Sequence, residues 1–81
     1  MNIIQLLAIR YTVAAMYHLR DMQHARASGC SELEILRETA FGRGARIALV
    51  TTLQAALKTA PEHRAQVAAS IRDAIAYMSK P

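Results

Sequence analysis

The sequence is poor in the residues that cross-link, interrupt or metallate small folds. Of its 81 residues, one is cysteine, two are proline, three are glycine and none is tryptophan. A single cysteine excludes an internal disulfide and is typical of a reducing compartment. The absence of Cys-x-x-Cys and His-x-x-x-His pairs excludes the common zinc motifs. Because small folds often gain stability from disulfides, metals or oligomerisation, association with another chain is the route left open.

Long uninterrupted apolar runs are also missing. The apolar stretch from Ile3 to Leu19 is shorter than the ~20 residues that cross a bilayer. Arg10 lies at its middle, and no basic segment precedes it as in a secretory signal. We therefore expect a cytoplasmic protein with no membrane partner.

Acidic residues are fewer than basic ones, six against ten, which gives a formal net charge of +4. The basic residues are spread evenly along the chain, so this charge permits nucleic acid or an acidic protein as partner without selecting either. Eight of the ten are arginine. Together with abundant alanine, this indicates GC-rich coding and favours a bacterial or phage-encoded small protein.

Helical periodicity is what the sequence has in abundance. Hydrophobic residues make up 53% of the chain and recur at steps of three and four, with no strand-like alternation. The pattern predicts one all-α domain over residues 1–81, a small antiparallel bundle of three to four helices completed by homodimerisation. We expect helices at about residues 2–27, 32–41, 45–58 and 60–79, with the middle two either separate or joined into one kinked helix.

The first helix carries more apolar surface than a bundle this small can bury. One stripe, which includes Ile4, Leu7 and Tyr11, accounts for the intramolecular core. Further apolar residues surround the rest of the helix, and a helix that is apolar nearly all round is normally buried all round. We assign these residues to a protein interface, for a second copy or another partner: Ile3, Leu6, Ile9, Val13, Met16 and Tyr17.

Local signals mark the helix starts. Ser31 followed by Glu34 predicts a capping box, with Cys30 and Ile35 placed as a hydrophobic staple. Gly29 suits the left-handed position that ends the preceding helix. Thr59 followed by Glu62 predicts a second capping box for the last helix, with Pro61 in its first turn.

Within the second helical stretch, Leu33, Leu36 and Ala40 are predicted to face the core. Further on, Leu53 and its neighbours Val50 and Leu57 are predicted to face inward. Gly42 and Gly44 lie between these groups and favour a break, because each glycine costs a helix about 0.8–1 kcal/mol relative to alanine.

Residues with catalytic potential have simpler structural interpretations. His18 lies on the apolar stripe and is read as a core-edge or interface residue, and Cys30 as a packed thiol. The carboxylates Asp21, Glu32, Glu34 and Glu38 are read as a solvated surface. We therefore assign no catalytic, cofactor or metal residue and expect no enzyme.

The segment around Gly42 and Gly44 presents a candidate anion or nucleic-acid contact. Glycines let backbone N–H groups approach an anion, and a turn at Gly44 would make residues 31–58 resemble a helix-turn-helix. The side chains that could contact phosphates or bases are Arg43, Arg46, Thr51 and Gln54.

Two functions follow from these observations. The first is a non-enzymatic regulatory or inhibitor protein that binds and modulates another protein through a helical apolar surface. The alternative is a small dimeric DNA-binding transcriptional regulator that uses the helix-turn-helix-like segment.

Overall fold

The protein is all-α, as the periodicity predicts. The structure, a computed structural model, describes residues 2–81, with the backbone alone at Glu38 and Phe41. These residues form α1 (Ile3–Ala27), α2 (Glu32–Thr59) and α3 (Arg64–Met78), with the short 3₁₀ turn η1 (Pro61–His63) between the last two. No strand occurs in this range. None of its helices combines the length and apolar character needed to cross a membrane.

Side-chain caps fix the starts of the two long helices. At α1, the Asn2 side chain accepts a hydrogen bond from the Gln5 backbone N–H (2.8 Å), and the Gln5 side chain accepts one from the Asn2 N–H (3.1 Å). At α2, Ser31 and Glu34 form the predicted capping box, with both bonds at 3.2 Å. Gly29 has φ of 81°, the left-handed conformation predicted for it.

The second helix is continuous from Glu32 to Thr59, so two separate helices over 32–41 and 45–58 are not formed. Gly42 and Gly44 lie inside it. Packing of a long helix against α1 outweighs their combined cost of about 2 kcal/mol. The predicted capping box at Thr59 is also wrong: Thr59 is the last residue of α2, and its hydroxyl donates to the Ala55 carbonyl oxygen at 3.2 Å.

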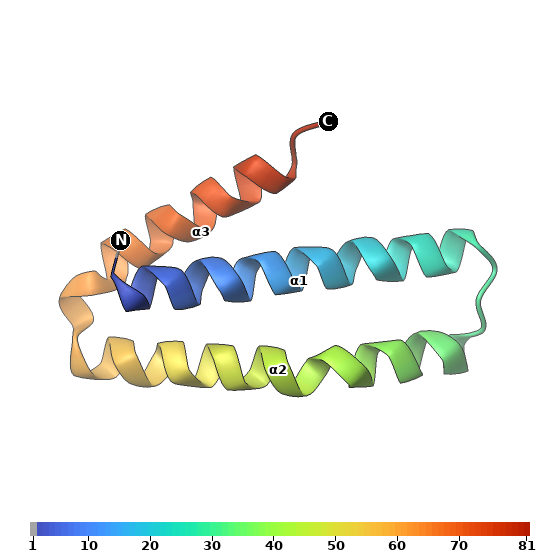
Figure 1. Cartoon of the computed structure of the whole chain (residues 1–81), viewed down its shortest axis with the longest axis horizontal. Coiled ribbons are helices and arrows are strands. Elements are labelled where there is room, and N and C mark those ends of the chain that lie inside the picture. Colours follow the sequence, from blue (N-terminus) through green and yellow to red (C-terminus); the bar gives the residue numbers. More distant parts are fainter. Residues whose placement is uncertain (1) are drawn as a thin grey trace.

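The three helices form a flat molecule with α1 in the middle (Figure 1). α2 packs antiparallel to α1 along its length, and α3 packs against the first half of α1 on the other side, then diverges from it. The Cα extents are 45 × 29 × 14 Å. The connections are short, which explains the antiparallel pairing of neighbours.

The core is small and lies where all three helices meet. Ala8 of α1, Leu53 of α2 and Val67 of α3 are buried together, with Ile4 and Leu7 packed against them. Thr12 is also buried, with its hydroxyl donating to the Ala8 carbonyl oxygen at 2.8 Å. Among the residues described, no large side chain is completely buried.

At the start of α2, the predicted inward face is wrong. Leu33 and Leu36 are 67% and 63% exposed, Ala40 is exposed, and Ile35 is buried in their place. The rotation of α2 is set by Leu53 and its half-buried neighbours Val50 and Leu57, which do face inward as predicted. Because α2 is one continuous helix, this rotation turns Leu33 and Leu36 away from α1.

The fold buries little surface for its length. Its accessible surface is 6024 Å², whereas folded monomers of this mass average about 4,800 Å². Its radius of gyration is 14.6 Å, whereas a compact domain of this length has about 11.7 Å. The chain therefore leaves about 1,200 Å² more surface exposed than an ordinary monomer does.

Candidate interaction surfaces

The first candidate surface is one side of α1, which we call the α1 open face: Ile3, Leu6, Arg10, Tyr17 and Arg20. These positions are separated by three, four, seven and three residues, which places them along one side of the helix, and all five side chains are exposed. Ile3 is 72% and Tyr17 52% exposed. The Arg20 guanidinium lies 5.7 Å from the centre of the Tyr17 ring, in cation–π contact. This face carries no carboxylate.

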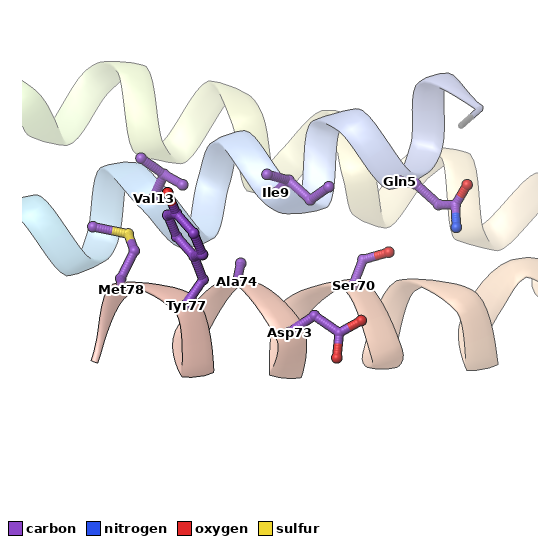
Figure 2. Close-up of a pocket in the computed structure, with 8 residues that line it drawn as sticks. All are labelled: Gln5, Ile9, Val13, Ser70, Asp73, Ala74, Tyr77 and Met78. Carbon is purple, nitrogen blue, oxygen red and sulfur yellow. The ribbon is translucent and has the colours of Figure 1, made fainter. Parts of the chain in front are cut away.

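Beside the open face runs the second surface, the groove between α1 and α3. It has a volume of about 620 Å³. Figure 2 shows Ile9 and Val13 on α1, with Ala74, Tyr77 and Met78 pointing towards them from α3 on the opposite wall. Asp73 contributes the charge among the residues that line this groove. The groove is therefore apolar, open and marked by one carboxylate.

The six residues assigned to an interface from the sequence divide between these two surfaces. Ile3, Leu6 and Tyr17 are exposed on the open face. Ile9 and Val13 are half-buried in the α1–α3 groove, and Met16 is half-buried one turn beyond Val13. The wall that α3 contributes was missed, because nothing in the sequence says which side of α1 the last helix covers.

The third surface follows the side of α2 that α1 leaves uncovered. We call it the α2 outer strip: Leu33, Leu36, Arg43, Ile47, Thr51, Gln54 and Lys58. All seven side chains are exposed, and their steps of three, four or seven residues place them along one face of the helix. Its first half is mainly apolar and its second half is polar and basic. Apolar side chains and polar or basic side chains are therefore both accessible on one continuous helix.

Of the four predicted anion contacts, Arg43, Thr51 and Gln54 lie on this strip, and Arg46 lies between it and α1. Arg43 and Arg46 line one concavity with Tyr11 and Ile47. Thr51 and Gln54 line the next one along the helix, together with Lys58 and Arg64. Among the side chains that the structure describes, no carboxylate lines either concavity. The structure thus places arginine, lysine and hydroxyl groups in one row.

Arg46 differs from the others because it is half-buried between α1 and α2. It lines a second concavity with Tyr17, His18 and Asp21 on the α1 side. A Cβ atom at Gly42 would stand 2.8 Å from its Nη1 atom, so glycine at this position leaves room for the guanidinium. This is a packing role for Gly42, and Arg46 is less available to a ligand than Arg43.

The helix-turn-helix arrangement predicted as an alternative is absent from residues 31–58. The backbone is helical through Gly42 and Gly44, so no turn separates a recognition helix from a supporting one. Any nucleic acid bound here would lie against the side of one long helix.

The residues examined for chemistry remain dispersed. Cys30 is exposed rather than packed as predicted, because Ile35, its intended staple partner, turns towards α1. His18 is half-buried between the long helices, beside Asp21 and Ile35. The side chain of Glu38 lies outside the described residues. Within the described part of the chain, no group of three metal-binding side chains comes together.

No known protein family, curated protein or solved structure matches this chain.

Proposed function

We propose that this protein is a non-enzymatic regulator that binds and modulates another protein through the α2 outer strip. The observation that carries the proposal is the exposure of large apolar side chains on a rigid helix that the rest of the chain leaves uncovered. Leu33, Leu36 and Ile47 are each more than half exposed. Exposed apolar side chains grouped on one surface mark interaction sites in soluble proteins.

The composition of the strip indicates the chemistry of the partner. Leu36 and Ile47 are eleven residues apart, which places them about 16 Å apart along one side of the helix. Arg43 lies between them, and Lys58 and Arg64 follow. An amphipathic helix with an apolar side and acidic flanks would match this order, burying the apolar anchors and pairing the basic rim.

The test is a tagged capture experiment, followed by binding of the purified captured protein. We expect Ile47→Asp to weaken that binding at least about tenfold, because it replaces one of the three apolar anchors with a charge. Thr52→Asp is the matched control: this exposed residue lies on another side of α2, and it should bind as the wild type does. Equal binding by Ile47→Asp and the wild type would refute the assignment.

A second candidate, nucleic-acid binding, is supported by the row of Arg43, Lys58 and Arg64 with Thr51 and Gln54. In that case Arg43→Ala with Lys58→Ala would weaken binding to duplex DNA and reduce its salt dependence, whereas the apolar variants would have little effect. The exposed leucines favour the protein partner, because nucleic-acid interfaces are polar and strongly charged. Captured proteins that disappear after nuclease treatment would reverse this preference.

A further inference from the structure

We propose that a second copy of this chain covers the α1 open face, with the two α1 helices antiparallel and each lying along the α1–α3 groove of the other copy. This goes beyond the proposed function, because it assigns α1 to self-association and leaves α2 free for the partner. Three independent observations support a second copy as the occupant: the area left exposed, the spacing of the residues, and the distribution of charge.

The exposed area matches what a dimer buries. A standard protein interface removes about 800 Å² from each partner, and obligate homodimers remove more. The surplus surface of this chain is about 1,200 Å² relative to ordinary monomers. One two-fold contact along α1 would therefore lower the accessible surface of each chain to about that of an ordinary folded monomer.

The spacing along α1 is that of a helix–helix seam. Ile3, Leu6, Arg10, Val13, Tyr17 and Arg20 follow the alternating three- and four-residue steps with which two helices pack along their length. In an antiparallel pair centred between residues 11 and 12, Leu6 lies opposite Tyr17 of the second copy, so that two large apolar side chains meet on each side of the two-fold axis.

This register is self-complementary, as a two-fold interface requires. Every contact occurs twice, once in each direction, so that a short segment of α1 supplies both sides of the interface. Val13 is then covered by the aliphatic part of Arg10 of the second copy, a use of arginine that keeps its charge at the rim. The half-buried residues of the groove become buried in the pair.

Charge favours the same occupant. Asp73 lines the α1–α3 groove from the α3 side, and the first twenty residues of the chain contain Arg10 and Arg20 but no acidic residue. In the antiparallel register, Arg20 of the second copy lies opposite Ile3. Its side chain leans towards its own N-terminus, and hence along the groove to Asp73. A basic apolar helix thus meets an apolar groove with one negative charge.

The other apolar surface does not suit a second copy as well. The α2 outer strip and the concavities beside it carry Arg43, Lys58 and Arg64. Two such strips facing each other would bring like charges together, which disfavours pairing. The structure therefore separates a surface suited to its own copy from one suited to an acidic partner.

The decisive experiment measures the mass of the purified chain in solution by light scattering and sedimentation, from micromolar to submillimolar concentration. The expected mass is twice that of the 8.9 kDa chain. Leu6→Asp should raise the dissociation constant of the dimer at least about tenfold, whereas Leu33→Asp on α2 should leave it unchanged. Both leucines are exposed in the single chain, so circular dichroism should show both variants folded.

A charge exchange tests the register. Arg20→Asp and Asp73→Arg should each weaken the dimer, and the double variant should restore it, because the exchanged charges meet only between copies. Arg43→Asp, with the same change of charge on α2, is the control. A wild-type chain of single mass throughout the range would overturn the proposal, as would a dimer abolished by Leu33→Asp and retained by Leu6→Asp. Neither result would affect the Ile47→Asp test of partner binding.

Discussion

At the scale of single residues, the two glycines of α2 have different roles. Gly42 makes space for the Arg46 guanidinium, which fills the region between the long helices. At Gly44, no side chain of the described residues and no backbone from another part of the chain lies within 4 Å of the position that a Cβ would occupy, and its φ is not in the left-handed region. The packing of the described residues therefore does not require glycine at position 44.

We expect Gly44→Ala to raise the free energy of unfolding by about 0.5–1 kcal/mol, because alanine has the higher helix propensity and meets no obstacle. Thermal unfolding followed by circular dichroism measures this as a rise in Tm of a few degrees. Gly42→Ala is the comparison, since its new methyl group must displace Arg46 and should yield a smaller gain. A loss of stability at position 44 would mean that glycine is needed there for a close approach by another chain.

At the scale of helices, the two predicted capping boxes have different outcomes: the one at the start of α2 forms, and the one predicted for the last helix does not. The Ser31 hydroxyl accepts a hydrogen bond from the Glu34 backbone N–H, and the Glu34 carboxylate accepts one from the Ser31 backbone N–H. Thr59, which has the same sequence spacing to Glu62, forms only a bond back to the Ala55 carbonyl oxygen. The same sequence pattern therefore forms a capping box at Ser31 and does not form one at Thr59.

We expect Ser31→Ala to lower the free energy of unfolding by about 1 kcal/mol, since it leaves backbone N–H groups of the first turn without a protein partner. Thr59→Ala should stay within about 0.5 kcal/mol of the wild type. Chemical denaturation of the two variants side by side compares these values directly. Equal losses would show that Thr59 acts as a cap in solution.

The same contrast explains how far the sequence could predict this fold. The start of α2 and the end of α1 were predictable because Ser31, Glu34 and Gly29 act on their own neighbours. The orientation of Leu33 and Leu36 was not, because it depends on how Leu53, twenty residues away, docks against Ala8. The α1–α3 groove could not be predicted from the sequence either, since it exists only once α3 has folded back along α1.

For the candidate surfaces, the sequence indicated that α1 has surplus apolar residues, but not which of them lie on the α1 open face and which in the α1–α3 groove. The surplus of apolar residues on α1 was visible, and Ile3, Leu6 and Tyr17 are indeed exposed. That Ile9 and Val13 share a groove with Asp73 could not be inferred from spacing along one helix. Leu33 and Leu36 of the α2 outer strip were assigned to the core, so their accessibility emerged only from the structure.

At the scale of the whole molecule, the stability of the fold depends on how much surface a single chain can bury. The core of one chain consists of a few small and medium side chains around Ala8, and the flat arrangement leaves both long helices widely accessible. Chains of this size are marginally stable even when compact. A chain that buries less than usual should draw much of its stability from the partner surface, and this dependence can be measured.

We expect Tm to rise with protein concentration, because unfolding of a dimer releases two chains and is opposed by mass action. With unfolding entropies typical of folded proteins, a dimer of this length should gain about 4 °C for each tenfold increase in concentration. Calorimetry of the wild type over two decades of concentration, with Leu6→Asp as the dissociated reference, makes the comparison. The variant should melt at a lower temperature that is independent of concentration. If the wild type also melts at one temperature throughout, the single chain is stable alone and the surplus surface on α1 serves a different partner.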